Sequence, residues 1–421
     1  MLGIKTFIKK NILYPKALFP KNIDNFPERP IFTILIKARL QGVLQGLREQ
    51  KRYITPDSLI GFPKRQSIDV WRKLLPYNPN NLGNWSIKGI KPNQETAAIE
   101  KELILKMIDL YHCNKNKIEG YVSSGGTESN IFLAWLGRKY LEKEGIERER
   151  ICFVRTDLTH YSIEKATDIV GLKSFITSLD KENWNINVLG FRKTIRALVN
   201  KGYRGFLLPL TLGYPLTGTS DSIEDICKEI KILRKEFKKI EFFVWVDAAS
   251  NGLIEPFLNE DFRPFLFSEI QGFSTDFHKF GFVPMPAGLV LYRNNLRELI
   301  EKPVDYLDQK DNTLLGGRSG ITPVACWVLV NSLGKAGFRK LILDKRKKME
   351  IFIKENGNKK EIKIISSPNS LNCGIIGKGN AKTLNTIEKE LSLKFRQIKI
   401  KFFGNDKYLT LKIAKAFFNN Y

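Results

Sequence analysis

Four short apolar runs, separated by stretches with helical periodicity, constrain the fold of this chain most strongly. They are ICFV (151–154), GFLLPL (205–210), FFVWV (242–246) and AGLVLY (287–292), with helical stretches such as 127–143 and 222–237 between them. Strands that are apolar throughout and alternate with helices are typical of a mainly parallel sheet that helices cover on both faces. The pattern therefore predicts an α/β fold.

The 421 residues divide into three predicted parts. Prolines interrupt residues 1–80, which we expect to form an N-terminal segment with a helix over 31–52. Residues 81–330 carry the alternating strands and helices and form the predicted large domain. Residues 331–421 are more charged and alternate only weakly between apolar and polar positions, so we expect a smaller C-terminal α+β domain.

The formal net charge of +25 raises the question of a nucleic-acid or membrane partner. The lysine-rich run 339–363 contains acids as well and has a helical rhythm, which indicates a solvated face. No nucleic-acid-binding motif accompanies it, so we expect no nucleic-acid role.

No run of 18 apolar residues occurs, which excludes a conventional spanning helix in the sequence. The basic, amphipathic residues 1–21 would suit a membrane surface, or they pack on the protein or on a partner subunit. We favour packing because this stretch contains lysines only, whereas transit peptides are usually rich in arginine. We expect a cytoplasmic protein.

Cysteine usage indicates a reducing compartment. The five cysteines, at 113, 152, 227, 326 and 373, form no CxxC pair, and their spacing to His112 or His160 does not match a zinc site. We therefore expect reduced thiols and no metal ion.

Two motifs join apolar strands to turns that can hold a ligand. GYVSSGGTESN (120–130) runs from a strand through glycines into a helix, where free backbone N–H groups can bind a phosphate; the alternative is a turn in which Thr127 caps the helix. VWVDAAS (244–250) ends a buried strand with Asp247, where ligands of open α/β sheets bind; the alternative is an acid that caps the following turn.

Two further motifs supply a histidine and a lysine. THYSIEKA (159–166) contains His160, which is either a site residue or a hydrogen-bonded structural residue. FSTDFHKFGFVPMPAGLVLYR (273–293) places Lys279 in an irregular segment before a strand, and a lysine partly withdrawn from water can form a Schiff base. A phosphate seat, a carboxylate, a flat aromatic ring and such a lysine are together what pyridoxal phosphate requires.

In their order and wording, these motifs resemble the group II pyridoxal-phosphate-dependent amino-acid decarboxylases. The motif sequences are most similar to those of archaeal L-tyrosine/L-aspartate decarboxylases and are also similar to those of histidine and glutamate decarboxylases. The resemblance extends from about residue 65 to about residue 340. The resemblance implies the aspartate-aminotransferase-like fold of type I, pyridoxal 5'-phosphate as cofactor in the large domain, and a homodimer with shared active sites.

The resemblance also implies a role for each matching residue. The phosphate would be held by Gly125, Gly126 and Thr127, with His278 beside it. His160 would stack on the pyridine ring, and Asp247 would pair with the ring nitrogen, with Ala249 under the ring. Lys279 would carry the cofactor as an aldimine. Gly317 and Arg318 in LLGGRSGITPVACW (314–327) would approach the neighbouring subunit's cofactor. Tyr306 is either the proton donor on a mobile loop or an ordinary surface tyrosine.

The implied reaction is decarboxylation of an aromatic or acidic L-amino acid to the amine and carbon dioxide. One alternative is an aldehyde-lyase similar to sphingosine-1-phosphate lyase, although VPMPAG (283–288) follows the decarboxylase wording. The other is a catalytically idle homologue that acts as a basic scaffold, which the retention of Lys279, Asp247 and His160 opposes.

The chain departs from the family in TLGYPLTGTSD (211–221). Tyr214 and Pro215 stand where relatives carry two threonines, so a hydroxyl near the cofactor is lost unless Thr217 or Thr219 compensates. We expect Asp221, three residues before Glu224, to be the N-cap of the next helix.

Overall fold

The computed structural model describes residues 40–41, 43–45, 63–83, 94–305, 309–360 and 362–377, and the backbone of 412–417. The chain separates into two compact units, Met1–Asp57 and Ser58–Tyr421. The described residues of the first unit are helical, which agrees at those positions with the helix predicted over 31–52. All features below belong to the second unit.

The described helices are α3 (Arg65–Leu74), α4 (Gln94–Leu110), α5 (Gly126–Lys143), α6 (Ser162–Ile169), α7 (Val188–Asn200), α8 (Ile223–Glu236), α9 (Glu255–Leu258) and α10 (Ile321–Asn356). The strands of the main sheet are β2 (Ile118–Tyr121), β3 (Ile151–Arg155), β4 (Lys173–Ile176), β5 (Gly205–Thr211), β6 (Glu241–Asp247), β7 (Ile270–Thr275) and β8 (Leu289–Arg293). Short pairs are formed by β1 (Asn80–Leu82) with β11 (Gly317–Ser319) and by β9 (Lys302–Val304) with β10 (Gln309–Asp311).

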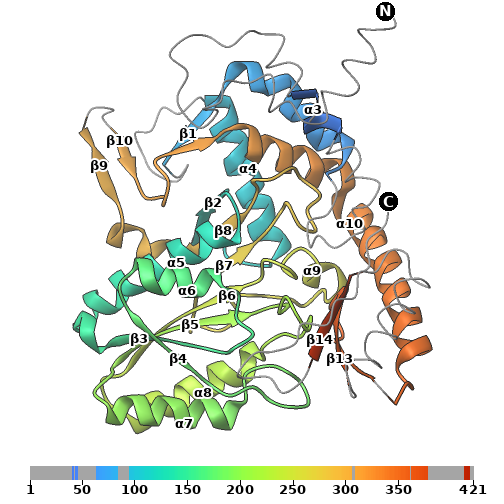
Figure 1. Cartoon of the computed structure of the whole chain (residues 1–421). Helices are drawn as coiled ribbons and strands as arrows, with labels where there is room; N and C mark the ends of the chain where they lie inside the picture. Colours follow the sequence, from blue (N-terminus) through green and yellow to red (C-terminus); the bar gives the residue numbers. More distant parts are fainter. Residues whose placement is uncertain are drawn as a thin grey trace, which may run out of the picture. The chain divides into compact units, whose positions relative to one another are not determined.

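The central sheet has the strand order β2-β8-β7-β6-β5-β3-β4 (Figure 1). Strands β7, β6, β5, β3 and β4 pair in parallel, whereas β8 is antiparallel to both of its neighbours. The predicted α/β fold with a mainly parallel sheet is confirmed, and the four predicted strands correspond to β3, β5, β6 and β8.

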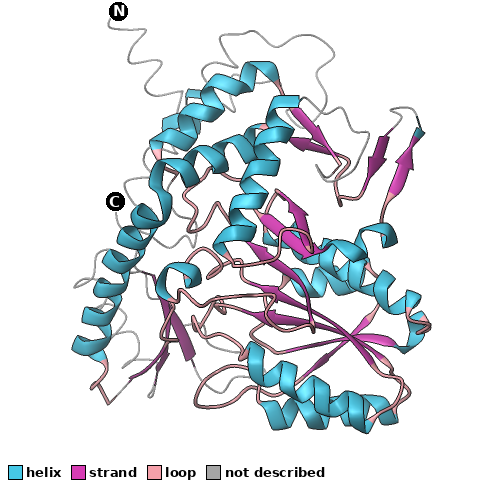
Figure 2. Cartoon of the chain, turned by 180° about the vertical axis from the view of Figure 1, so that it is seen from behind, coloured by secondary structure: helices cyan, strands magenta, loops and turns pink. Residues whose placement is uncertain are grey.

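Alternating side chains of the central strands enter two cores, one on each face of the sheet. Phe206 and Phe242 pack with residues of α4, α7 and α8, whereas Leu207 and Phe243 pack with residues of α5 and α6. Every residue of β5 is buried. Figures 1 and 2 show the resulting three layers, with helices on both sides of the sheet. Burial on both faces explains why these strands are continuous apolar runs.

Helix α10 leads from the main sheet to a small antiparallel sheet of β12 (Ile362–Ile365), β13 (Asn372–Gly377) and β14 (Lys412–Phe417). Gly334 interrupts α10 with a positive φ of 58°. The boundary predicted at 330/331 falls inside α10, four residues before this kink, and it remains a prediction. The helix and the strands that follow residue 331 agree with the expected α+β character of this part.

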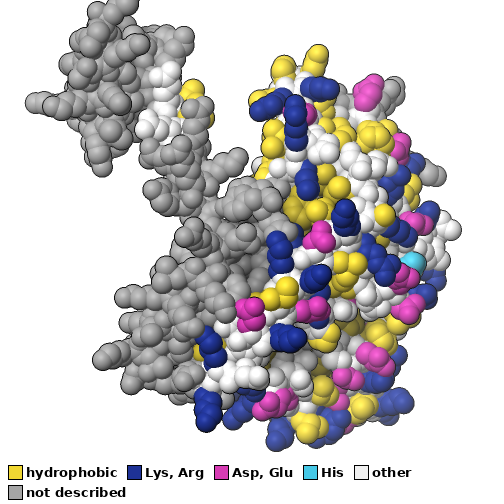
Figure 3. All heavy atoms as spheres, turned by 90° about the vertical axis from the view of Figure 1, so that its right-hand side faces the viewer, with side chains coloured by type: hydrophobic (Ala, Val, Ile, Leu, Met, Phe, Trp, Pro, Cys, Tyr) yellow, Lys and Arg dark blue, Asp and Glu magenta, His cyan; other side chains and the backbone are white. Residues whose placement is uncertain are grey.

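The described surface in Figure 3 carries lysine and arginine interspersed with acids rather than a patch of one sign. Ion pairs such as Arg346–Glu350 (2.9 Å) and Lys363–Glu182 (3.0 Å) are examples within or near the lysine-rich run. The solvated mixed face predicted for this run agrees with that distribution. None of the described helices is both long enough and apolar enough to cross a membrane.

Candidate active site

The predicted residues of the glycine turn and of the segments around His160, Asp247 and Lys279 lie where strands of the main sheet end. Strands β2, β3, β5, β6 and β7 share one direction, because β8 is antiparallel to both β2 and β7. Their carboxyl ends therefore meet at one edge of the sheet, which is the edge where ligands bind in open α/β folds.

At this edge β2 runs into a glycine turn that opens α5. Gly125 is the N-cap residue, with φ 147°, and no side chain of the described residues caps the helix there. A Cβ atom on Gly125 would lie 2.9 Å from His278 Cε1, and one on Gly126 would lie 3.1 Å from the Ala249 Cβ. The turn therefore requires glycine and leaves N–H groups of the first helical turn for an anion, whereas the alternative of Thr127 as the N-cap is wrong.

Asp247 ends β6 and is 3 % exposed. Its Oδ2 accepts a hydrogen bond from Asn130 Nδ2 at 2.8 Å, and its Oδ1 accepts one from the backbone N–H of Ala249 at 3.2 Å. Asn130 lies on α5 and is itself oriented by Trp245, whose Nε1 donates to Asn130 Oδ1 at 3.0 Å. Helix α5, through Asn130, and the segment after β6, through the Ala249 N–H group, thus fix the direction of the Asp247 carboxylate.

His160 is connected to Asp247 through two side chains that the sequence analysis did not select. His160 Nδ1 lies 2.8 Å from Ser162 Oγ, and Ser162 Oγ accepts from Asn130 Nδ2 at 2.9 Å. The backbone N–H of Ser162 also donates to His160 Nδ1 at 3.2 Å. Because Nδ1 accepts hydrogen bonds, the ring of a neutral His160 carries its proton on Nε2.

Lys279 lies in the turn that follows β7, where Asp276 is a third residue that the sequence analysis did not select. Lys279 Nζ is 3.1 Å from Asp276 Oδ2, and His278 Nε2 is 3.5 Å from the same oxygen. Asp276 is 3 % exposed, and a Cβ atom on Gly126 would lie 3.3 Å from its Oδ2. This close approach places the lysine turn and the glycine turn side by side.

His278 packs against the glycine turn in a largely desolvated position. Burial lowers the pKa of His278 below its usual value, and it outweighs the opposing effect of the Asp276 carboxylate. The imidazole Nδ1 accepts a hydrogen bond from the backbone N–H of Ala287 at 3.3 Å. A neutral imidazole therefore borders the turn that is suited to an anion.

Arg318 makes its contacts inside its own chain. Its guanidinium pairs with Glu100 at 2.7 Å, donates to the carbonyls of Val122 and Gly83, and lies 4.8 Å from the centre of the Tyr121 ring. Arg318 is 7 % exposed, whereas Gly317 is exposed. The approach of Gly317 and Arg318 to a neighbouring subunit's cofactor remains a prediction, and Tyr306 lies outside the described residues.

The loop that departs from the family contains a buried phenol. Tyr214 Oη donates to the Asp221 carboxylate at 2.9 Å, and this carboxylate also accepts from the backbone N–H groups of Thr211 at 2.7 Å and Ile186 at 2.9 Å. The prediction that Asp221 caps α8 is wrong, because these buried N–H groups take its oxygens. Ser222 is the N-cap, accepting from the backbone N–H of Asp225 at 3.3 Å.

Thr217 and Thr219 direct their hydroxyls toward each other and toward the Trp184 carbonyl. The two Oγ1 atoms are 2.6 Å apart, and Thr219 Oγ1 donates to the Trp184 carbonyl at 2.7 Å. Both residues are buried. Their compensation for the missing threonine hydroxyl near the cofactor remains a prediction.

The buried Asp221 leads to a testable pH dependence. Burial raises the pKa of Asp221 from 3.8 to about 6 despite its three donors, so the carboxyl ionises in the unfolded chain before it ionises in the folded one. The contribution of the Asp221 carboxyl to folding stability is complete below the pKa that this group has in the unfolded chain. It is lost as the pH rises through about 6, the pKa in the folded chain. Between about pH 4.5 and about pH 7.5 we expect this carboxyl to lower the free energy of unfolding by roughly 2 kcal/mol.

Urea unfolding of the wild-type protein and of Asp221→Asn at the two pH values measures this contribution. The free-energy difference between wild type and variant should be smaller at the higher pH. An unchanged or larger difference would contradict the assignment.

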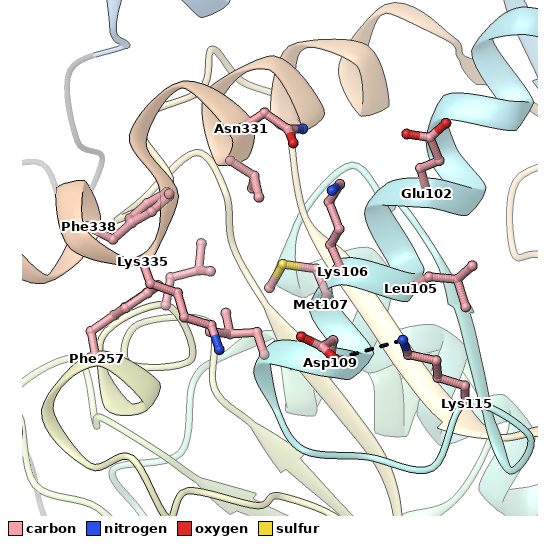
Figure 4. Close-up of a pocket in the computed structure, with 14 residues that line it drawn as sticks. Glu102, Leu105, Lys106, Met107, Asp109, Lys115, Phe257, Asn331, Lys335 and Phe338 are labelled. Atoms are coloured by element: carbon pink, nitrogen blue, oxygen red, sulfur yellow. Dashed lines mark ion pairs between the residues drawn. The ribbon is translucent and has the colours of Figure 1, made fainter.

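A pocket of about 580 Å³ lies elsewhere, between α4, α9 and α10 (Figure 4). Leu105, Met107, Phe257 and Phe338 line it together with polar residues that include the ion pair Asp109–Lys115 (3.7 Å). None of the predicted site residues contributes to this pocket.

The fold and the site define the chain as a fold-type-I α/β protein whose residues fit pyridoxal phosphate: a glycine turn open to an anion, a buried and oriented carboxylate, and a lysine in the segment that adjoins the glycine turn. A family model described as the pyridoxal-dependent decarboxylase conserved domain matches residues 89–376, more than half of the chain. The chain belongs to this family. It is a pyridoxal-phosphate-dependent amino-acid decarboxylase, as the resemblance implied.

Curated relatives are decarboxylases. The chain is 28 % identical to a histidine decarboxylase of Klebsiella aerogenes over 276 residues, which is 65 % of this chain and 69 % of that protein. It is 30 % identical to a tryptophan decarboxylase of Clostridium sporogenes over 270 residues, covering 63 % of this chain and 64 % of that protein.

Solved structures share the fold at lower identity. A glutamate decarboxylase of Lactobacillus brevis has a TM-score of 0.75 at 14 % identity, covering 94 % of this chain and 89 % of that one. A sphingosine-1-phosphate lyase of Burkholderia pseudomallei has a TM-score of 0.73 at 17 % identity, covering 96 % and 90 %. These similarities confirm the predicted fold type but do not separate a decarboxylase from a lyase.

Proposed function

We propose that this decarboxylase acts on an aromatic L-amino acid, with acidic amino acids as the second candidate class, and that its chemistry takes place at the edge formed by the glycine turn, Asp247 and Lys279. The observation that carries the proposal is the hydrogen-bonded line from His160 through Ser162 and Asn130 to Asp247. It orients a ring and a carboxylate at the same edge of the sheet where Lys279 adjoins the glycine turn.

Each residue has a definite task in the proposed site. Gly125, Gly126 and Thr127 would hold the phosphate with backbone N–H groups, and the Lys279 amine would form the covalent bond to the cofactor. Pyridoxal phosphate, when bound, withdraws the electrons that carbon dioxide leaves behind. Asp247 would favour a proton on the ring nitrogen, because its oriented carboxylate is buried where a positive charge is otherwise costly.

His160 would bring the flat face of its ring against the cofactor. The imidazole is held from one side, since Ser162 supplies both a hydroxyl and a backbone N–H to Nδ1. A ring fixed in this way can orient a bound substrate without a change of its own rotamer, which lowers the entropic cost of reaching the reactive geometry. Tyr306 stays our candidate for the proton donor.

The relatives support the choice of substrate class. Two of the curated relatives, those described above, are named for histidine and tryptophan, both of which have aromatic side chains. Acidic amino acids are retained because a glutamate decarboxylase shares the fold and because the motif wording is similar to an aspartate-using family.

Incubation of the full-length protein and pyridoxal phosphate with single amino acids tests the proposal. We expect carbon dioxide and the matching amine from L-histidine, L-tryptophan or L-tyrosine, measured by mass spectrometry, with L-aspartate and L-glutamate as the second group. A phosphorylated long-chain amino alcohol serves as the substrate for the lyase alternative. Release of a long-chain aldehyde from it, with no amine from any amino acid, would contradict the proposal.

We further infer a homodimer in which Gly317 and Arg318 approach the neighbouring subunit's cofactor. The support is the resemblance of residues 314–327 to the segment that does so in relatives. Five free cysteines support a reducing compartment, the cytoplasm.

A further inference from the structure

Tyr214 stands where relatives carry a threonine, yet its phenol is turned away from solvent. The residue is completely buried and packs in a small cluster with Leu158, Trp184 and Ile365. A ring in this position does not line an open substrate cavity. The effect that the Tyr214 hydroxyl has on the site must therefore pass through the groups that this hydroxyl contacts.

The hydroxyl lies in the middle of a directional hydrogen-bond chain. Tyr214 Oη donates to Asp221, whose carboxylate can only accept. Tyr214 Oη in turn accepts from Thr156 Oγ1 at 3.1 Å. Because Asp221 is itself held by two backbone N–H groups, it anchors the far end of the chain.

The end of this hydrogen-bond chain that lies opposite Asp221 reaches the segment that carries His160. Thr156 Oγ1 lies 3.2 Å from Thr159 Oγ1, and the backbone N–H of Thr156 donates to the same Thr159 oxygen at 3.1 Å. The backbone N–H of Thr159 also bonds the carbonyl of Thr156 at 3.2 Å. These contacts fix the turn between β3 and α6, and His160 is the next residue after Thr159.

We propose that Tyr214 is a positioning residue for His160, acting through Thr156 and Thr159. The His160 imidazole is then held at Nδ1 by Ser162. The backbone that leads to His160 is held by the hydrogen-bond chain that begins at Asp221. In relatives, a threonine hydroxyl at this position would face His160 from the cofactor side. In this chain the buried phenol of Tyr214 supports the His160 turn from the opposite side. The catalytic consequence rests on the proposed function of His160, whereas the positioning can be measured without catalysis.

The 421-residue chain provides a direct readout, since three histidines occur in it. The imidazole NMR signals of His112, His160 and His278 can be assigned with three single His→Asn variants. In Tyr214→Phe we expect the His160 signal to move and the His112 signal to stay in place. With pyridoxal phosphate and the best amino-acid substrate, kcat should fall on the order of tenfold while KM changes by less than about twofold, since orientation and not binding is lost.

Tyr111→Phe is the matched control. Tyr111 is equally buried and donates its hydroxyl to the Gly252 carbonyl at 2.9 Å, but it does not belong to the chain that leads to Thr156. A second variant, Thr156→Val, breaks the same chain at its next link and carries the test if Tyr214→Phe does not fold. The two changes should move the His160 signal similarly and should not add when combined.

Equal movement of the His160 signal in Tyr214→Phe and Tyr111→Phe would overturn the proposal, as would additive effects of Tyr214→Phe and Thr156→Val. A shifted His160 signal in a protein that releases no amine from any amino acid would leave the positioning intact and refute only the proposed function.

Discussion

Replacing Lys279 with alanine is expected to abolish covalent attachment of pyridoxal phosphate. Lys279 lies beside the glycine turn, with its amine 3.1 Å from Asp276, and no other nitrogen nucleophile is expected to form the bond there. Borohydride reduction of the loaded protein, followed by peptide mass spectrometry, should place the added mass on the peptide that contains Lys279. The variant should show neither the added mass nor the visible absorbance of the bound cofactor.

Lys345 supplies the matched control for this experiment. Burial lowers the pKa of Lys345 to about 8, so its amine is nucleophilic near neutral pH, and its Nζ lies over the rings of Phe280 and Phe282, which follow Lys279. Lys345→Met should retain covalent cofactor. A borohydride-stable adduct on the Lys345 peptide, or an unchanged adduct in Lys279→Ala, would contradict the assignment of Lys279.

Asp247→Asn is expected to lower kcat by about a hundredfold or more. The neutral amide cannot stabilise a proton on the ring nitrogen, and removal of one such preorganised electrostatic contact typically costs this much. Covalent attachment through Lys279 should persist, because Asp247 makes no hydrogen bond to that lysine in the described part of the chain. Steady-state kinetics with the best substrate measure the loss, and cofactor fluorescence measures attachment.

Glu229→Gln controls for the general cost of neutralising a buried acid. Glu229 is 2 % exposed and pairs with Arg192 at 2.6 Å between α7 and α8, away from the carboxyl-end edge. This variant should lose stability but keep kcat within about twofold. A similar loss of kcat in both variants would show that Asp247 acts through stability alone.

The local sequence predicts the parts of the site that depend on short segments. A Cβ atom at position 125 would collide with the His278 ring, and one at position 126 would crowd the Ala249 Cβ at 3.1 Å, so the two glycines indicate a close approach of these segments. Asp247 follows an apolar run that is typical of a parallel strand buried on both faces. Its position after this run therefore places it at the carboxyl end of that strand. The fold class follows from the same runs.

Other contacts join segments that are distant in the sequence, and no local pattern predicts them. Asn130 and Asp247 are 117 positions apart, and Arg318 and Glu100 are 218 positions apart. Arg318 illustrates the difference: the motif resemblance implies an approach to the neighbouring subunit's cofactor, which remains a prediction, and only the folded chain shows that the guanidinium pairs with the buried Glu100. A buried charge takes the nearest available partner, which only the packing of β11 against α4 supplies.

Asp221 shows the same limit within a short segment. The spacing to Glu224 is that of a capping box, and the actual cap is one residue later, at Ser222. The buried N–H groups of Thr211, at the end of β5, and of Ile186, before α7, have no other acceptor in the described contacts, so satisfying them outweighs satisfying the exposed end of α8.

By itself the sequence determined the α/β fold and, through the resemblance of its motifs, the family and the cofactor. It also selected the glycine turn, Asp247, His160 and Lys279 as candidate site residues, because each of these inferences rests on residue order within a short segment. Only the tertiary structure decided how these residues are held: Asp276 beside Lys279, Ser162 and Asn130 between His160 and Asp247, and Tyr214 behind the His160 turn. Orientation of a side chain depends on hydrogen-bond partners from other strands and helices, and these partners meet only when the sheet has formed.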